Sequence, residues 1–444
     1  GGEEGGLSRG RTFDGEPLRG ENRGTMEPRR EGTGGMGRPL EGVRVLDLTW
    51  VLAGPFGSMI LADLGADVIK VERPPYGDIS RTTGPYQNGW SGYFFSVNRG
   101  KRSLAIDLKH PEGRELFLRL VEHADVVIEN FTPGTLEKLG LGYEVLSARN
   151  PRVILASISG FGQTGPYRDR PALDIVVQAM GGVLSITGEP GGPPIRPGVS
   201  YGDVVAGMFA VIGILAALRE RDRSGLGQAI DISMLDCQVT VMENAIMRYF
   251  VTGEVPGPLG TRHPSATPFQ AFPTADGWIV IALGFGEENQ WNLLCAILGV
   301  PELIDDERFL TGPRRTQHHA ELEPLLAAAF RRRTTAEWLE ELLAAGIPAG
   351  PVNTVREVVA DPQVQARGMI REVTHPVAGT IPIANTPVRM SRSETGIAGP
   401  PPDLGGDTAD VLGELLGLSE EEIRALAERG VLALESRLDI SEIT

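Results

Sequence analysis

Short apolar segments alternate with helical segments from Leu40 onward, and this alternation limits the possible fold more than any other feature of the chain. A strand, a crossover helix and a further strand in this succession are typical of a parallel sheet covered by helices. Gly, Pro and Asn residues separate the segments. We therefore predict an α/β fold with a doubly wound core. Its strands are expected at 43–48, 67–72, 125–129 and 152–158, and its helices at 57–64, 111–123, 204–218 and 235–250.

A second, smaller domain is expected because 444 residues are too many for one ordinary core. Gly and Pro residues between Gly253 and Pro268 mark a break, and a buried strand at 277–283 follows it. The helical tail at 409–433 is expected to return to the first lobe. The predicted boundaries are a disordered tail at 1–37, the N-terminal part of the large domain at 38–235, a linker helix and loop at 236–265, the small domain at 266–355, and a return linker with the C-terminal part of the large domain at 356–444.

The first 37 residues are rich in Gly, Glu and Arg and hold few bulky apolar side chains. Such a segment cannot bury enough surface to fold, so we expect it to be disordered. Met36 stands directly before the first patterned segment, and two origins stay open for the stretch before it: a genuine tail, or sequence upstream of a start at Met36.

Composition excludes several classes of function. The formal net charge of −16 disfavours a nucleic-acid-binding protein. Only Cys237 and Cys295 occur, far apart, so we expect no disulfide framework or Cys-rich metal site. We find no run of about 18 apolar residues and no leader, and expect a cytoplasmic protein with no membrane partner. One stretch is locally basic and suits a phosphorylated ligand through Lys70, Arg73, Arg81, Arg99, Lys101, Arg102 and Lys109.

The usual hydrolase and metal signatures are missing from the sequence. No Ser sits in a G-x-S-x-G elbow. The His318–His319 pair lacks a third ligand at metal spacing, so we interpret it as a solvated helix start and expect no metal. The Gly188–Gly192 run lacks the Lys-Ser/Thr of a phosphate loop and is interpreted as a surface loop that could act as a lid.

Carboxylates in glycine-rich turns are the remaining candidates. Asp203 lies directly ahead of the long apolar helix, where free backbone N–H groups and the positive helix end would keep it ionised and lower its pKa. An ionised, buried carboxylate is a competent nucleophile toward a thioester. From local physics alone, however, an ordinary N-cap is the favoured interpretation of Asp203. Asp174, ahead of the apolar run 175–177, is by itself either an N-cap or a general base.

Ordered segments between Pro39 and Leu432 together resemble the class III CoA-transferases, the family of formyl-CoA transferase and carnitine CoA-transferase. No single segment carries the resemblance; their order and spacing do. The segments are Pro39–Asp47, Ala53–Pro55, Leu64–Pro74, Asn98–Ser103, Glu129–Gly134, Gly160–Gly162 and Gly202–Met208.

This resemblance implies a nucleophile, a coenzyme A site and a fold. In the family the aspartate of the Gly-Asp turn forms an acyl anhydride and then an aspartyl-CoA thioester, and Asp203 occupies its position. Asp174 falls where members carry an acidic residue near the acyl group. The implied fold is a Rossmann-like large domain formed by both chain ends plus a smaller α+β middle domain, in an interlocked homodimer. CoA thioesters are substrates, and no cofactor is bound permanently. The implied coenzyme A contacts are Val51, Leu52, Ala53, Arg73, Ile106, Lys109, Asn130, Phe131, Thr132 and Lys138, with Arg73 and Lys109 as the phosphate partners.

Departures from the family pattern bear on the substrate. Oxalate-using members carry a Gln where this chain has Leu52, and four glycines where it has the stretch 262–266, so oxalate and formate are disfavoured. The stretch 263–270 resembles members that use succinyl-CoA as donor and a dicarboxylate as acceptor. Arg262 or His263 would then bind the acceptor's far carboxylate, with a purely structural loop as the alternative.

Two other functions remain open alternatives. An α-methylacyl-CoA racemase shares the fold and uses a His and Asp pair, and Asp174 falls at its Asp. This chain has no His between His123 and His263, where the racemases place theirs, so the proton-transfer pair is incomplete. A non-catalytic acyl-CoA-binding protein would keep every activity after Asp203→Ala.

Overall fold

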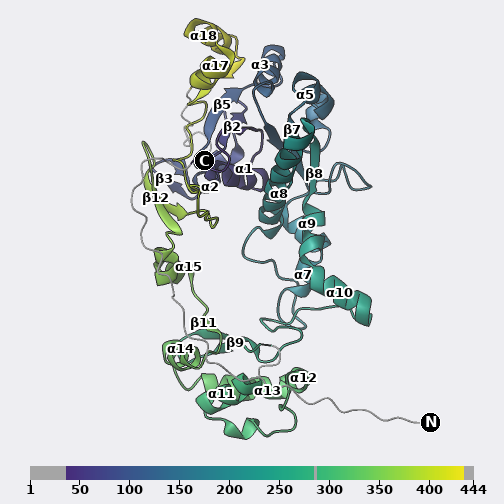
Figure 1. Ribbon diagram of the computed structural model, residues 1–444, viewed down its shortest axis with the longest axis vertical. Coiled ribbons are helices and arrows are strands. Elements are labelled where there is room, and N and C mark those ends of the chain that lie inside the picture. The colour runs from purple at the N-terminus through teal and green to yellow at the C-terminus, as the bar shows by residue number, and fades with distance from the viewer. Residues whose placement is uncertain (1–36, 285–287, 435–444) are drawn as a thin grey trace, which may run out of the picture. The chain divides into compact units, whose positions relative to one another are not determined.

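A seven-stranded sheet forms the centre of the computed structural model, which describes residues 37–284 and 288–434 (Figure 1). The expected tail at 1–37 lies outside the described residues apart from Gly37. The spatial order is β14-β5-β2-β1-β6-β7-β8, and every neighbouring pair is parallel except β14–β5. Counted along the chain, the parallel strands stand in the order 3-2-1-4-5-6, which is that of doubly wound dinucleotide-binding folds. The predicted α/β fold with a mainly parallel sheet is confirmed. The strands are β1 (Arg44–Asp47), β2 (Asp67–Glu72), β5 (Arg102–Ile106), β6 (Val126–Glu129), β7 (Ile154–Ser159), β8 (Ala229–Ser233) and β14 (Leu432–Ala433).

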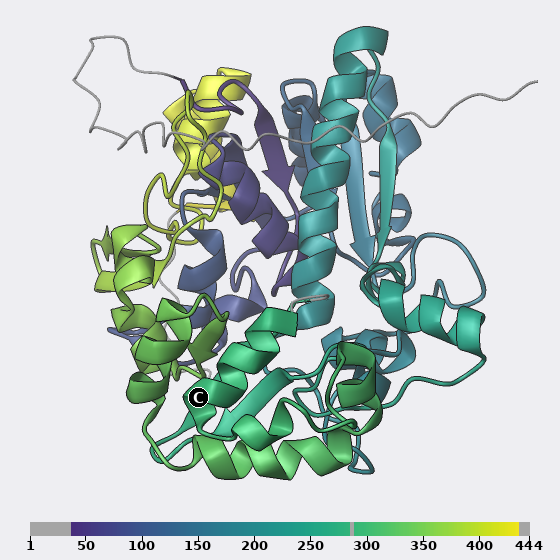
Figure 2. The ribbon, with the colours of Figure 1, turned by 60° about the horizontal axis from the view of Figure 1, so that its bottom comes forward.

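Each face of this sheet has its own hydrophobic core, because successive residues of a strand point to opposite faces. Val45 and Val126 belong to one cluster, and Leu46 and Val127 belong to the other. Helices α1 and α8 pack side by side on the first face (Figures 1 and 2). Near the C-terminal end, β14 pairs with β5, and α17 and α18 contribute to the second cluster. The helices are α1 (Ala53–Asp63) and α8 (Tyr201–Ser224) on the first face, and α3 (Pro111–Val121), α5 (Tyr143–Arg149), α17 (Thr408–Leu416) and α18 (Glu420–Glu428) on the second.

Shorter elements follow the strands of the large sheet or connect its helices. They are η1 (Ile79–Thr82), β3 (Tyr86–Gln87), β4 (Trp90–Ser91), α2 (Gly92–Asn98), α4 (Thr135–Lys138), α6 (Asp174–Met180), α7 (Val183–Ile186), α9 (Met234–Val241) and α10 (Glu243–Thr252).

A separate three-stranded sheet, ordered β11-β10-β9, has a hydrophobic cluster of its own between Phe272 and Ile347. A hairpin of β12 and β13 follows along the chain. The domain boundaries proposed above stay predictions. The elements are β9 (Phe269–Pro273), β10 (Trp278–Ala282), α11 (Glu288–Leu298), η2 (Pro301–Leu303), α12 (Gly312–Gln317), α13 (His319–Phe330), α14 (Thr335–Ala344), β11 (Ala349–Pro351), α15 (Val355–Ala360), α16 (Pro362–Ala366), β12 (Ile370–His375) and β13 (Gly379–Ala384).

Three expectations about the helices were wrong. The helix predicted at 235–250 is two helices, α9 and α10, which meet at Met242. Helix α8 begins at Tyr201 rather than at 204, so its first turn includes Asp203. His319 begins α13 but is buried, and its Nε2 lies 2.5 Å from Gln270 Oε1, so that half of the histidine pair is not solvated.

Helix α8 is also long and apolar enough to cross a membrane by length and composition, although no apolar run of about 18 residues was expected. Its buried side chains, such as Val205, Ala210 and Ile214, pack against α1 and the sheet. Core burial therefore accounts for the inner face of this helix.

Candidate active site

The loops that follow β1 and β6 meet at the point where the strand order of the large sheet reverses. Trp50 and Asn130 join these loops through reciprocal hydrogen bonds. The Trp50 N–H donates to Asn130 Oδ1, and Asn130 Nδ2 donates to the Trp50 carbonyl, each over 2.9 Å. In doubly wound sheets, ligands bind in the crevice at this reversal, outside the carboxyl ends of the strands. Two cavities open there.

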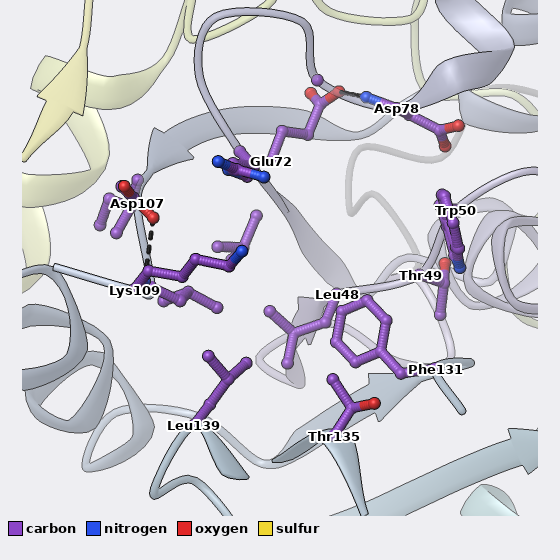
Figure 3. Close-up of a pocket in the computed structure, with 15 residues that line it drawn as sticks. Leu48, Thr49, Trp50, Glu72, Asp78, Asp107, Lys109, Phe131, Thr135 and Leu139 are labelled. Atoms are coloured by element: carbon purple, nitrogen blue, oxygen red, sulfur yellow. Dashed lines mark hydrogen bonds between the residues drawn. The ribbon is translucent and has the colours of Figure 1, made fainter. Parts of the chain in front are cut away.

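The first cavity has a volume of about 380 Å³, which suits a small-molecule ligand (Figure 3). Apolar side chains such as Leu48 and Leu139 form much of its wall, and Phe131 contributes a ring. Lys109 points into it from the loop after β5 (Figure 3). Of the predicted coenzyme A contacts, four line this cavity: Arg73, Ile106, Lys109 and Phe131.

The basic stretch between Lys70 and Lys109 is mostly an internal ion-pair network, and not the open basic region that the sequence suggested. Five of its cations bind carboxylates, several of them buried. Arg73 and Lys109 form no ion pair within the described part of the chain, and both are exposed at the first cavity. They are therefore the cations left for a phosphorylated ligand. The pairs are Lys70–Asp78 (2.9 Å), Arg81–Glu72 (2.7 Å), Arg99–Asp63 (2.6 Å), Lys101–Asp47 (2.9 Å) and Arg102–Asp67 (2.8 Å).

One of these pairs holds the loop after β1 in a strained shape. Val51 has φ +65°, a left-handed conformation that is an outlier for a β-branched residue. Its N–H donates to Asp78 Oδ1 over 3.1 Å, while Lys70 Nζ donates to the Thr49 carbonyl over 2.7 Å. Burial opposes the charge on Asp78, but the Lys70 ammonium and the N–H groups of Ser80 and Val51 together outweigh it and lower the pKa of Asp78. The buried pair thus fixes the backbone between the two cavities.

The second cavity has a volume of about 290 Å³ and shares Trp50 and Phe131 with the first. Asp203 and Asp174 both line it. It also contains the predicted contacts Val51, Leu52, Ala53, Asn130 and Thr132, together with Arg168, Arg170, Leu173 and Met234. Two adjacent cavities with a common wall suit a long ligand that carries its reactive group at one end.

Asp174 is fully engaged in holding the turn that precedes α8. Its Oδ1 accepts from the Gly202 N–H over 2.8 Å, and its Oδ2 accepts from Arg196 Nη2 over 2.7 Å. Gln178 Nε2 donates to both oxygens over 2.8 Å. Its carboxylate therefore positions the start of α8, where Asp203 lies, rather than standing free for proton transfer.

Asp203 has a pKa opposite to the sequence prediction. It lies in the first turn of α8, but the Gly202 N–H is taken by Asp174, and no hydrogen bond reaches the Asp203 carboxylate within the described residues. Burial, with a further contribution from the negative charge of Asp174, raises the pKa of Asp203 to about 7, against the opposing charge of Arg196. The predicted lowering was wrong because burial dominates at this position and the Gly202 N–H serves the neighbouring Asp174 carboxylate. The Gly202 N–H is therefore not available to stabilise an oxyanion at Asp203.

The N-terminal halves of α1 and α8 are brought together by two glycines, Gly57 and Gly207. A Cβ on Gly207 would stand 2.6 Å from the Ala53 carbonyl oxygen, and one on Gly57 would stand 2.9 Å from the Gly207 carbonyl oxygen. Because the two helices cross so closely at these glycines, Ala53 of α1 and Asp203 of α8 both line the second cavity. Within the described residues no side chain caps the N-terminus of α1, so the first N–H groups of that helix have no side-chain acceptor there.

Three predicted contacts line neither cavity. Lys138 is exposed at the end of α4. Arg262 lies near His319, whose pKa falls mainly through burial and partly through the Arg262 charge, while His263 packs its ring against Phe269 at 4.9 Å between centroids. Their roles stay predictions.

Sequence reasoning missed Trp50, Asp78, Arg168 and Arg170. Trp50 could have been found, because it follows a strand whose carboxyl end faces the ligand crevice. Arg168 and Arg170 stand just ahead of Asp174, whose own candidacy could have drawn attention to its neighbours. For Asp78 the sequence carries no such signal, because its partners become neighbours only in the fold.

A family model described as CoA-transferase family III matches residues 40–408. The chain belongs to this family. A succinyl-CoA:glutarate CoA-transferase of Mus musculus is 43% identical over 396 residues, which cover 89% of this chain and 90% of that protein. A succinyl-CoA–D-citramalate CoA-transferase of Chloroflexus aurantiacus is 43% identical and covers 89% of this chain and 98% of that protein. The crystal structure of a CaiB/BaiF family protein from Brucella suis has a TM-score of 0.78 and 43% identity over 85% of this chain and 100% of that chain.

This family III CoA-transferase therefore moves coenzyme A from an acyl-CoA to a carboxylic acid, as predicted. The racemase alternative is not favoured. Among the described residues no histidine lines either cavity, so a His and Asp pair for proton transfer at the α-carbon is missing there.

Proposed function

We propose that this CoA-transferase takes coenzyme A from succinyl-CoA, or a related dicarboxylic acyl-CoA, to a second dicarboxylic acid through covalent intermediates on Asp203. The observation that carries the proposal is that Asp203 is the carboxylate of the second cavity without a hydrogen-bond donor in the described chain, whereas Asp174 is saturated. The relatives named for succinyl-CoA, glutarate and D-citramalate support the substrate class.

The proposed reaction proceeds in two mirrored halves. The Asp203 carboxylate attacks the donor thioester carbonyl, the C–S bond breaks, and a mixed anhydride and CoA thiolate form. The thiolate then attacks the Asp203 acyl carbon, which releases the donor acid and leaves an aspartyl-CoA thioester. The acceptor carboxylate repeats these steps in reverse, and Asp203 regains its carboxylate. The free N–H groups at the start of α1, at Ala53 and Gly54, would stabilise the oxyanions.

Coenzyme A would extend from the first cavity into the second in this proposal. Arg73 and Lys109 would bind its phosphates, because they are the unpaired cations of the first cavity within the described chain. The thioester would pass the shared wall at Trp50 and Phe131 to reach Asp203. The other predicted contacts, Lys138 among them, remain part of this proposal, and the mechanism uses no metal or bound cofactor.

The homodimer also remains a proposal, supported by exposed apolar surface. Helix α10 buries none of its own residues, and Phe250 and Val251 are each 75% exposed. Apolar surface of this kind usually marks an interface. The interlocked arrangement and a cytoplasmic location rest on the sequence predictions alone.

Intact-mass measurement tests the nucleophile. Protein incubated with succinyl-CoA and then hydroxylamine should gain one hydroxamate, and peptide mapping should place it at Asp203. Asp203→Asn should abolish the modification and lower activity at least ~1,000-fold, as expected for a covalent nucleophile. Hydroxamate at another residue, or full activity without any modification, would overturn the proposal.

A further inference from the structure

We propose that Arg170 binds the far carboxylate of dicarboxylic substrates while the near carboxyl group reacts at Asp203. The inference rests on the proposed function and deepens it, because it assigns a substrate-selecting residue. Both residues line the second cavity.

The guanidinium of Arg170 stacks on an aromatic ring and has no other polar partner within the described residues. Its Cζ lies 3.7 Å from the centroid of the Tyr167 ring. In the described part of the chain it forms no ion pair and no hydrogen bond. Stacking on a ring fixes the plane of a guanidinium and leaves its N–H edges free, and those edges match a carboxylate in a bidentate pair.

The other arginines near Asp203 are already engaged. Arg168 donates from Nε to the Gln163 carbonyl over 2.9 Å and from Nη1 to Asp169 over 2.8 Å. Arg196 is bound to Asp174. Arg170 is thus the cation of this cavity that no protein carboxylate neutralises within the described residues.

The wall of the cavity suits the middle of such a substrate. Leu173, 74% exposed, lines it together with Ile158 and Met234, so methylene groups between two carboxylates would meet apolar side chains. A monocarboxylate of the same length would leave the Arg170 guanidinium without its anionic partner. Sites built around a charged hydrogen bond reject analogues that lack the matching group.

Paired acceptors test the assignment in the full-length enzyme. With succinyl-CoA as donor, initial rates are measured for glutarate and for pentanoate, which differ by one carboxylate. We expect Arg170→Gln to raise the KM for glutarate about 10–100-fold while kcat falls little, and to remove most of the preference for glutarate over pentanoate. Arg170→Lys should fall between, because it keeps the charge and loses the fork.

Two matched variants complete the experiment. Arg219→Gln, an exposed arginine of α8 outside both cavities, should behave as wild type. Arg262→Gln tests the competing assignment from the sequence. If Arg170→Gln and Arg170→Lys both keep the wild-type preference, or if Arg262→Gln loses it instead, the inference is overturned. Failure of the proposed function would look different, because the wild-type enzyme itself would then transfer no coenzyme A between dicarboxylates.

Discussion

The proposed nucleophile, Asp203, lies in surroundings that oppose its ionisation. Burial and the charge of Asp174 raise its pKa to about 7, and only the ionised form attacks a thioester. We therefore expect kcat/KM for succinyl-CoA to rise with pH through about 7 and to level off above it. A pH–rate profile from about pH 5 to about pH 9 measures this. A profile that stays flat down to pH 5 would show that the free enzyme holds an unperturbed carboxylate.

The Asp203 carboxylate should also lower the folding stability of the protein at neutral pH, compared with a variant that has an uncharged side chain at this position. Its folded pKa is raised, so stability falls as pH rises from about 4, where the unfolded chain loses its proton, to about 7, where the folded chain does. Asp203→Asn should then be more stable than wild type by about 2–4 kcal/mol at pH 8, and the gain should shrink toward zero near pH 4. Urea unfolding at both pH values measures the difference. If Asp203→Asn gains the same stability at both pH values, the gain comes from packing and not from the charge of Asp203.

The Lys70–Asp78 pair carries the third prediction about individual residues. Asp78→Asn leaves a fully buried ammonium without its carboxylate, which typically costs about 3–5 kcal/mol. The side-chain oxygen of Asn can still accept a hydrogen bond from the Val51 N–H. We therefore expect the loop after β1 to keep its conformation while the protein loses stability. Asp306→Asn is the control, because its pair with Arg308 lies at the surface, where 45% of the Arg308 side chain and 22% of the Asp306 side chain are exposed, and it should leave the Tm nearly unchanged. Equal Tm values for the two variants would contradict the buried role.

Among the elements, α1 and α8 determine the geometry of the second cavity through their glycine crossing. Gly207→Ala would put a Cβ 2.6 Å from the Ala53 carbonyl oxygen, so α1 must shift away from Asp203. We expect kcat to fall at least ~10-fold, because small misplacements near reacting groups are costly. Gly413→Ala in α17 is the control, since its Cβ would meet nothing closer than 3.7 Å and Ala favours a helix. Unchanged kcat in Gly207→Ala would show that the crossing tolerates a methyl group.

Elements with strong periodicity could be predicted from the sequence, whereas breaks and pairings could not. The strand expected at 67–72 is β2 without a shift, because apolar residues and flanking turns define both its ends. The break at Met242 has no Gly or Pro to announce it. In the site, Arg73 and Lys109 were predicted by position, but Lys101 was expected to face a ligand and instead binds Asp47, 54 residues away in sequence. Such pairing arises from the strand order, which composition does not reveal.

For the whole molecule, the exposure of α10 favours the proposed homodimer. A helix of 10 residues is marginal in water on its own, and among the described residues no side chain of α10 is more than partly buried. We therefore expect sedimentation to give twice the chain mass of 47.6 kDa.

The double variant Phe250→Asp, Val251→Asp should weaken the dimer and lower activity, because a charge would replace each of two apolar side chains that are 75% exposed. Val145→Asp on α5, a less exposed site away from α10, is the matched control and should leave the mass unchanged. A wild-type protein that is monomeric at micromolar concentration would contradict the proposal. In that case α10 would be stable without a partner, and its backbone N–H groups should be protected from hydrogen exchange in the monomer.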